Sequence, residues 1–242
     1  MALTEIPIEL SSTPGIVDNS NATAITIGSD ESVAIGGSVS ISHDGGDSLT
    51  LTKTTTEPSL RLEGDTNKDF VITVSGELLT ITKNDGGTDI LTLDHDTGAV
   101  KKPLQPAFLV RPASTQANIP IAATTTILLG TEVFDQGSNF ASNTFTAPVT
   151  GRYQFDAAIY CLTVDSATEY VQLALRTSNR LYYYIFSTNT LSQDAFYMSF
   201  PLSVLADMDA GDTATVELQL PNSGTAQMDV NAVSSFSGHL VA

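Results

Sequence analysis

Short runs that alternate apolar and polar side chains are the feature that most constrains what this chain can fold into. In two of them, Tyr153 to Cys161 and Ala214 to Leu220, an apolar side chain recurs at every second position. Successive side chains of a β-strand point to opposite faces, so this spacing predicts antiparallel strands with one buried face. Clusters of Gly, Asp and Asn between the runs, such as residues 44–47 and 84–87, favour tight turns. The sequence therefore predicts an all-β protein with almost no helix, built as a sandwich or jelly roll.

The net charge excludes two classes of partner. The 242 residues carry 10 Lys and Arg against 27 Asp and Glu, which gives a formal charge of −17. A nucleic-acid-binding protein needs a cationic face that displaces counterions from the phosphates, and neither half of this chain offers one. An anionic membrane surface would repel the chain, and its longest uncharged run, residues 112–131, is broken by Pro120. We therefore expect no nucleic-acid partner and no membrane insertion.

The first 103 residues are a series of very short strands. Most share an apolar–Thr–apolar pattern, as in Ile25–Ile27, Leu49–Leu51, Ile72–Val74, Leu79–Ile81 and Leu91–Leu93. Strands with only two or three inward apolar residues cannot close a core within one chain. Three chains wrapped together could close one another's apolar faces, so residues 28–103 are expected to form an intertwined trimeric β stalk. A loose monomeric β meander is the alternative, and its exposed strand edges would invite aggregation.

Residues 1–27 are expected to form an extended leader. Pro7 and Pro14 fix φ and remove ladder donors, which disfavours regular sheet. The first ten residues carry Glu5 and Glu9 and lack a basic segment and a long apolar core, so no signal peptide is predicted. The segment resembles the opening of structural proteins from tailed phages, where such a leader anchors a fibre. That resemblance implies that other virion proteins are partners of the leader.

A domain boundary is predicted at residues 101–106, which hold two prolines and the only adjacent pair of lysines. Before residue 104 only Phe70 is aromatic, and the other 16 Phe and Tyr follow it. Longer alternating runs and denser aromatic residues after the boundary predict a head with its own core over residues 104–242.

The head carries three segments that resemble the C1q-like heads of the complement and tumour-necrosis-factor group. FTAPVTGRYQF, Phe145 to Phe155, is similar to the family's Phe-Thr-Ala-Pro-x-x-Gly-x-Tyr-x-Phe segment. Residues 205–220 are similar to its Leu-x-x-Gly-Asp-x-Val-x-Leu stretch, and SSFSGHLVA, residues 234–242, to its Phe-Ser-Gly-x-Leu ending. The chain departs from the family in lacking tryptophan, and residues 171–196, where the family carries variable surface loops, follow none of its patterns.

The resemblance implies a ten-stranded jelly roll that assembles as a homotrimer and binds a ligand without chemistry of its own. It implies that four aromatic residues lie in the core or the trimer interface of the head, namely Phe145, Tyr153, Phe155 and Phe236. It also implies two sets of turn residues, Pro148 with Gly151 and Gly211 with Asp212.

No catalytic constellation is found in the sequence. His43, His95 and His239 lie far apart, and no G-x-S-x-G, H-E-x-x-H or P-loop motif occurs. Cys161 sits in an apolar run and is expected to be a small buried hydrophobic residue rather than a reactive thiol. We therefore expect neither enzymatic activity nor a cofactor.

Two acidic segments are weighed as metal sites. Residues 94–96, Asp-His-Asp, could ligate a metal, although a polar strand end accounts for them equally. Asp207, Asp209 and Asp212 have a calcium-like spacing but lack the Gly and the distal Glu of an EF-hand. No metal is predicted, and calcium at the second segment is kept as the alternative.

The densest aromatic cluster supplies the candidates for receptor binding, Tyr182, Tyr183 and Tyr184. Alternation sends Tyr183 to the opposite face from its two neighbours. Exposed tyrosines give contact area at low entropic cost and stack on sugars or peptides. Arg176 and Arg180 bracket the preceding turn and could contact acidic glycans. The alternatives are that the tyrosines line the core or trimer interface and that the arginines only solvate a loop.

These observations predict a virion structural protein, a homotrimeric phage tail fibre or fibre-like receptor-binding protein. Its head would contact a glycan or protein on the host cell surface, and three sites per head would raise the avidity. The alternatives are a capsid or tail decoration protein with a purely structural trimerising head, and a bacterial lectin-like adhesin. The missing signal peptide counts against the adhesin.

Overall fold

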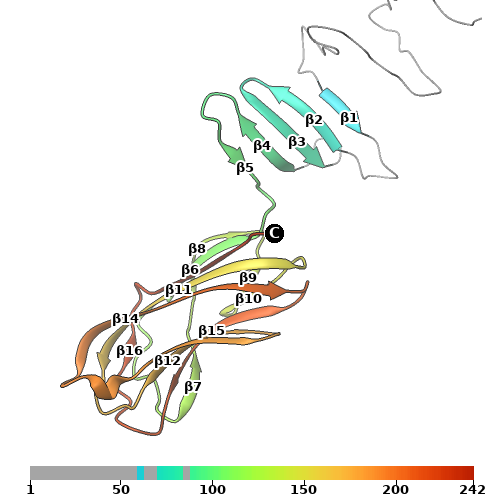
Figure 1. The fold of residues 1–242 in the computed structure, drawn as a ribbon. Helices are drawn as coiled ribbons and strands as arrows, with labels where there is room; N and C mark the ends of the chain where they lie inside the picture. The colour runs from blue at the N-terminus through green and yellow to red at the C-terminus, as the bar shows by residue number, and fades with distance from the viewer. Residues whose placement is uncertain (1–58, 63–69, 84–87) are drawn as a thin grey trace, which may run out of the picture. The chain divides into compact units, whose positions relative to one another are not determined.

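The structure is a computed structural model that describes residues 59–62, 70–83 and 88–242. The expected leader, residues 1–27, and much of the expected stalk lie outside the described residues. The described residues form three antiparallel sheets, one small and two larger (Figure 1). Their only helical element is a single 3-10 turn, η2 (Thr188–Thr190), so the all-β prediction is confirmed for this part of the chain. Nothing in this part forms a helix of the length and apolarity that a membrane crossing requires.

The small sheet is a five-stranded meander in the order β1-β2-β3-β4-β5. Its strands are β1 (Ser59–Leu62), β2 (Phe70–Ser75), β3 (Leu78–Lys83), β4 (Asp89–Asp94) and β5 (Val100–Lys101). Three of the predicted apolar–Thr–apolar tripeptides, residues 72–74, 79–81 and 91–93, therefore lie in β2, β3 and β4. A two-residue turn, Gly76–Glu77, joins β2 to β3, and its Gly has a φ of +55°, which suits a glycine.

One face of the small sheet is almost entirely apolar. The strand register brings Leu60, Ile72, Ile81 and Leu91 into one row across four strands. The same face carries one neighbouring row on each side, which completes a set of ten apolar side chains: Leu60, Leu62, Phe70, Ile72, Val74, Leu79, Ile81, Leu91, Leu93 and Val100. The opposite face is mostly polar and includes a ladder of threonines. No other described element covers the apolar face, and six of its side chains are between 38% and 57% exposed.

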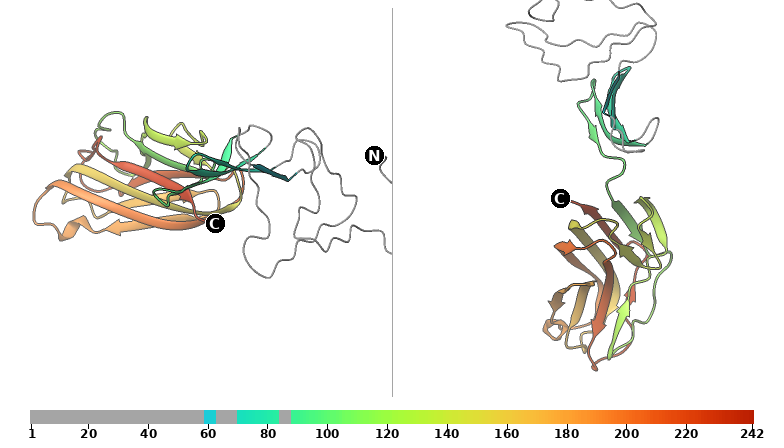
Figure 2. Two further views of the ribbon diagram at one scale, coloured as in Figure 1. Left: turned by 90° about the horizontal axis from the view of Figure 1, so that it is seen from above. Right: turned by 90° about the vertical axis from the view of Figure 1, so that its right-hand side faces the viewer.

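The head is a two-layer β-sandwich formed by the remaining strands (Figure 2). One sheet has the order β13-β12-β15-β10-β9, with β7 also paired to β15. Its strands are β7 (Ala123–Thr126), β9 (Phe140–Ala141), β10 (Thr144–Thr146), β12 (Val171–Thr177), β13 (Leu181–Phe186) and β15 (Thr213–Leu220).

The second sheet of the sandwich has the order β14-β11-β17-β6-β8, with β16 also paired to β11. Its strands are β6 (Ala107–Arg111), β8 (Thr131–Gln136), β11 (Gly151–Val164), β14 (Ala195–Met208), β16 (Asp229–Val230) and β17 (Ser235–Leu240). The last strand of the chain, β17, lies between β6 and β11. The first and last strands of the head are therefore neighbours, and β17 joins the β14–β11 pair to the β6–β8 pair.

Six aromatic rings fill the middle of the sandwich. They belong to Phe108, Phe140, Phe145, Tyr153, Phe155 and Phe236, and each side chain is at most 4% exposed. Phe108 stacks on Phe145 with ring centroids 4.9 Å apart and meets the edge of Phe236 at 5.0 Å. Stacked and edge-to-face pairs at these distances add to the burial of apolar area. The four aromatic residues expected in the core or trimer interface thus lie in the core.

The backbone of β17 approaches these rings closely at Gly238. A Cβ atom there would lie 2.6 Å from Cδ1 of Phe155 and 2.8 Å from Cε1 of Phe108, which is closer than carbon atoms can pack. Gly238 sits opposite Phe155 on β11 and Phe108 on β6. The absence of a side chain on β17 therefore makes room for two rings from its neighbouring strands.

We predict that Gly238→Ala destabilises the head by about 1–3 kcal/mol, because the added methyl group overpacks the ring layer. Chemical denaturation of the full chain followed by tyrosine fluorescence measures the effect. Ser237→Ala is the matched control, since Ser237 is the preceding residue and points to the other face of β17. Equal midpoints for the two variants would contradict the close packing described here.

Candidate binding surface

The candidate surface is the outward face of β13, β12 and β15. The inward residues of these strands belong to the buried core, among them Leu173, Leu175 and Leu218. The outward residues of β13 are Leu181, Tyr183 and Ile185, which are 40%, 57% and 47% exposed. Because β13 is the edge strand of its sheet, these three side chains form an apolar border along one side of the face. We call this whole surface the β13–β12–β15 face.

Polar side chains cover the part of the face beside that border. The strand register gives three rows, each beginning on β13 and crossing β12 to β15. The rows are Leu181–Arg176–Thr215, Tyr183–Ala174–Glu217 and Ile185–Gln172–Gln219. The middle row is distinctive because the small Ala174 stands next to the large ring-bearing Tyr183.

Arg176 and Glu217 form an ion pair across β12 and β15. The Nε atom of Arg176 donates to both carboxylate oxygens of Glu217 at 2.9 Å. This hydrogen bond and the charge of Glu217 raise the pKa of the Arg176 guanidinium above its ordinary value. Glu217 is only 8% exposed, so its carboxylate is almost fully withdrawn from solvent. The pairing makes the face locally neutral while the terminal nitrogens of Arg176 remain outside the pair.

The amides of Gln172 and Gln219 form a second cross-strand pair on the same two strands. Nε2 of Gln172 donates to Oε1 of Gln219 at 3.0 Å. This single hydrogen bond between two side-chain amides leaves the carbonyl oxygen of Gln172 and the NH2 group of Gln219 for a further partner. The pair therefore presents a donor and an acceptor side by side on the face.

The second arginine candidate, Arg180, is also paired. Its Nη2 and Nε atoms donate to the carboxylate of Asp207 at 2.6 and 3.1 Å. The same contact holds the pKa of Asp207 below its ordinary value. The expectation that Arg176 and Arg180 could serve acidic glycans is therefore not favoured, because each guanidinium already has a carboxylate.

The three tyrosine candidates divide between the two faces of β13. Tyr182 is partly buried and packs against the core together with Phe186. Tyr184 is on the same face as Tyr182 but is 40% exposed, because it lies at the edge of the sandwich. Only Tyr183 projects onto the β13–β12–β15 face. Among the three tyrosine candidates, it is therefore the one that lies on this face.

The expected turn residues occupy two adjacent loops, with one correction. Residues 148–150 form the turn before β11, and the hydroxyl of Tyr153 donates to the carbonyl of Val149 at 2.8 Å. Gly151 is not part of that turn but begins β11, where a Cβ atom would lie 2.7 Å from the carbonyl oxygen of Ala242 and 2.6 Å from Cδ1 of Leu240. The sequence pattern was therefore wrong about its role, since close packing against the C-terminal strand requires the glycine.

The second turn, between β14 and β15, contains Gly211 and Asp212. Gly211 has a φ of +94°, and its N–H donates to the carbonyl of Ala147 at 2.8 Å. Oδ2 of Asp212 accepts from the backbone N–H of Asp209 at 2.8 Å. It also accepts from Nδ2 of Asn179 at 2.8 Å. Asp212 thus ties this turn to the hairpin that joins β12 to β13.

Loops at the opposite end of the sandwich from the C-terminus are held by a buried carboxylate. Asp165 is 7% exposed and accepts from the N–H of Ala167 at 2.7 Å and from the N–H and hydroxyl of Thr225 at 2.6 and 2.8 Å. Burial raises its pKa, but these hydrogen bonds outweigh that effect and leave the pKa below its ordinary value of 3.8. A neighbouring carboxylate, Asp194, accepts from Ser166 and Gln227. The two acids fix the loops that precede β12, β14 and β16.

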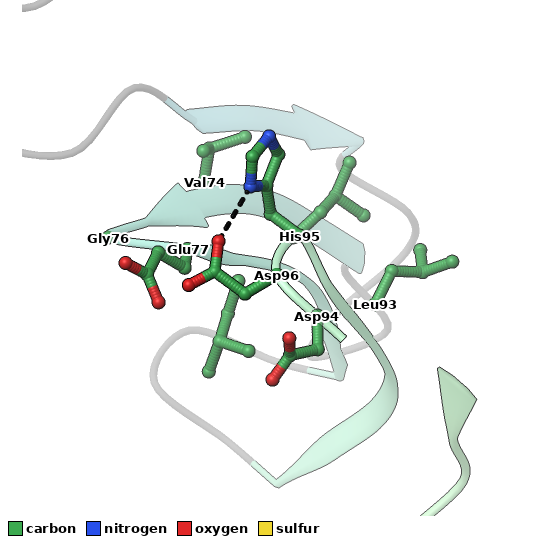
Figure 3. A pocket seen from close by; sticks show the side chains of 9 residues that line it. Val74, Gly76, Glu77, Leu93, Asp94, His95 and Asp96 are labelled. Carbon is green, nitrogen blue, oxygen red and sulfur yellow. Dashed lines mark hydrogen bonds and ion pairs between the residues drawn. The ribbon is translucent and has the colours of Figure 1, made fainter. Parts of the chain in front are cut away.

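A hollow of about 580 Å³ lies against the small sheet (Figure 3). It contains His95, whose Nδ1 atom is 3.0 Å from Oδ1 of Asp96, and the two side chains point toward each other in the picture. The N–H of His95 donates to the carbonyl of Glu77 at 2.7 Å, which pins this loop to the β2–β3 turn. His95 is 84% exposed at its side chain.

Neither of the acidic segments weighed as metal sites forms a ligand cluster. The described residues contain no group of three or more His, Cys, Asp or Glu side chains placed to hold a metal ion. Asp207 is engaged by Arg180, and Asp212 by backbone and amide donors. Of the other two histidines, His43 lies outside the described residues and His239 lies on β17.

Cys161 is fully buried in β11, as the sequence indicates. Desolvation, with a smaller contribution from Asp229, raises the pKa of its thiol to about 12. A thiol with such a pKa is protonated at neutral pH and is a poor nucleophile. Its role is to fill core volume.

Sequence reasoning missed Glu217, Gln172 and Gln219 as surface residues of the candidate site. The alternation in Ala214 to Leu220 places Glu217 and Gln219 on the outward face, so the signal for two of them was present. The cross-strand partners were not predictable, because alternation within one strand carries no information about which strand lies beside it.

Comparisons with known proteins concern the head. Residues 107–241 match the family model described as the C1q domain. Among solved structures, the globular domain of zebrafish complement 1qA is 16% identical with a TM-score of 0.43, and the match covers 57% of this chain and 98% of that one. Murine APRIL at pH 5.0 is 12% identical with a TM-score of 0.41, over 57% of this chain and 99% of that one. A search of the curated proteins finds no match.

We predict that Asp165→Asn destabilises the head by about 1–3 kcal/mol at pH 7, because an amide NH2 group cannot accept the hydrogen bonds of Thr225 or Ala167. The folded pKa of Asp165 lies below the unfolded value, so its stabilising effect is present above pH 3.8 and is lost as the pH falls through the folded pKa. The difference in free energy of unfolding between wild type and variant should therefore become smaller below pH 3.8. Chemical denaturation at several pH values measures it.

Glu169→Gln is the control for this prediction, since Glu169 is an exposed acid four residues away. It should leave stability unchanged at both ends of the pH range. If the free energies of unfolding of Asp165→Asn and wild type differed by the same amount at all pH values, the carboxylate would not titrate as described.

Proposed function

Because the chain belongs to the C1q domain family, we propose that it is a homotrimeric binding protein whose head contacts a surface ligand. C1q domains are generally binding modules without enzymatic activity, and they typically form homotrimers. The observation that carries the trimer for this chain is the apolar face of the small sheet, which no described element covers and which further copies of the chain would cover.

The small sheet supports a trimer through the chemistry of its two faces. Burial of apolar surface stabilises a fold or an assembly by about 25 cal/mol for every Å² removed from solvent. Ten apolar side chains on one face therefore strongly favour covering that face. The opposite face is polar through the ladder of Thr73, Thr80 and Thr92, of which Thr92 is itself only 7% exposed. Three copies that turn their apolar faces toward a common axis would bury all three faces and expose only the polar ones. The expected trimeric β stalk over residues 28–103 is proposed on this ground.

The head supports self-association through the outward face of β14, β11 and β17. Tyr197 is 62% exposed and stacks on Tyr160 with centroids 5.8 Å apart and an interplanar angle of 12°. Leu205, on the same face, is 54% exposed. Asp156 lies in the middle of this face, and its carboxylate accepts a hydrogen bond from the hydroxyl of Ser203 at 2.6 Å. An exposed aromatic and aliphatic surface of this kind is typical of protein–protein contacts.

We further propose that the protein is a fibre-like component of a phage virion, with residues 1–27 as its anchor and residues 104–242 as the head that meets the host. The support for this finer assignment is the resemblance of the leader to the opening of tailed-phage structural proteins. A stalk that precedes a binding head also places the head away from its anchor. A trimeric head that binds no surface would instead favour a decoration protein.

The full chain should have a native mass of about 76 kDa, three times its 25.5 kDa, by light scattering. Dilution should not dissociate it readily, because both the small sheet and the head would contribute interface. A mass near 25 kDa would remove the trimer, and the apolar face of the small sheet would then require cover from another part of the same chain.

A charge on the apolar face should open the small sheet without opening the head. In Val74→Asp we expect faster amide hydrogen exchange in β2, β3 and β4, because the carboxylate would be buried at the trimer axis. Thr73→Asp places the same carboxylate on the opposite face of the same strand and is the control. Equal protection of the two variants, measured by mass spectrometry, would contradict burial of that face.

A further inference from the structure

We propose that the β13–β12–β15 face of the head binds a neutral oligosaccharide. This inference rests on the proposed function, because it names the ligand class of a head that is taken there to bind a surface. Three features of the face favour this ligand: an aromatic platform, hydrogen-bonding groups left over from cross-strand pairs, and the absence of net charge.

The platform is the ring of Tyr183. Its side chain is 57% exposed, although Ala174, the residue paired with it on β12, is only 2% exposed. Ala174 does not belong to the core cluster, so the side chains that cover it are the longer ones around it on the outward face. Tyr183 therefore presents an exposed ring beside a covered alanine. A flat aromatic surface held in this way stacks on the apolar face of a sugar ring.

Groups for hydrogen bonding lie within two strands of that ring. Arg176 contacts Glu217 through Nε alone, so its two terminal nitrogens carry no partner among the described residues. The Gln172–Gln219 pair offers one amide donor and one acceptor in addition to its internal bond. Gln172 and Arg176 flank Ala174 on β12, so both are diagonal neighbours of Tyr183, and Gln219 lies one strand further on β15. Both sets are fixed by their pairs and would lose little freedom on binding.

The charge of the face disfavours anionic ligands. The guanidinium of Arg176 is neutralised by Glu217, and that of Arg180, on the adjoining turn, by Asp207. The chain as a whole carries a charge of −17, so an acidic polysaccharide would be repelled at long range. A hydroxyl-rich ligand without charge avoids this repulsion and uses the donors that remain.

The composition of the face also distinguishes it from the surface proposed for self-association. Its apolar residues are confined to the edge strand β13, and the two inner strands present amide, hydroxyl and paired charged groups. A protein interface generally buries apolar residues at its centre and places polar groups at its rim. Here the polar groups are central, which favours a polar ligand over a second protein.

The experiment is a binding survey of the full-length wild-type chain on immobilised oligosaccharides. The probes are neutral hexose, deoxyhexose and N-acetylhexosamine oligomers, together with their uronate and sulfated counterparts. We expect binding to at least one neutral oligomer, with an affinity that changes little between about 0.05 and 0.5 M salt, because screening weakens only charged contacts. Binding confined to anionic probes, or to none of the probes, would overturn the proposal.

Two variants tie the binding to this face. Tyr183→Ala should weaken it about tenfold or more, as expected for an exposed aromatic anchor. Tyr184→Ala, the same substitution on the other face of the same strand, should bind as wild type does. A double variant, Gln172→Leu with Gln219→Leu, replaces both partners of the amide pair by residues of similar size and should also lose binding while the denaturation midpoint is retained. Full binding by Tyr183→Ala would overturn the assignment of the face.

The native mass of each preparation separates this inference from the proposed function. A trimer that binds no neutral oligosaccharide would overturn the ligand class and leave the trimeric binding protein in place. A monomer that binds through Tyr183 would retain the ligand and overturn the trimer.

Discussion

The head depends on one close approach, in which the backbone of β17 at Gly238 lies against the rings of Phe155 and Phe108. Since β17 is paired on both sides, to β11 and to β6, it joins segments that are far apart in the chain. The ring layer can close only when this last strand is in place. The head is therefore expected to fold as one cooperative unit, with contacts that are mostly long-range and form slowly. A surface carried on such a unit is held rigidly, which suits recognition by preformed sites.

Alternation in the sequence predicted which side chains are buried but not which strands are neighbours. Tyr153 and Phe155 point inward as their spacing indicates, and the short tripeptides before residue 103 that are described became strands of one sheet. Gly151 was placed in a turn by its motif, whereas the structure shows that its missing side chain leaves room for Leu240 and the backbone of Ala242 at the far end of the chain. A motif records that a glycine is needed at a position. It does not reveal whether a backbone angle or a distant side chain imposes the need.

The candidate surface could be predicted only in part for the same reason. Tyr183 was identified correctly as facing away from its neighbours, because a period of two is a property of one strand. The interpretation of Arg176 and Arg180 as contacts for acidic glycans depended on their being unpaired. Their partners, Glu217 and Asp207, are on strands that the sequence did not place beside them. In a chain with 27 acidic residues and 10 basic ones, a carboxylate is readily available to each arginine, and local neutrality follows from the pairing.

The two proposals for the head use opposite sheets of the sandwich and therefore do not compete. Self-association through Tyr197 and Leu205 would occupy the outward face of β14, β11 and β17. The β13–β12–β15 face would then point away from the neighbouring copies, with Tyr183 accessible on each of them. Three such faces on one head would be fixed relative to one another by the rigid cores beneath them. A weak contact at each face could then give firm attachment, provided that the surface displays its sugars densely enough for two faces to engage together.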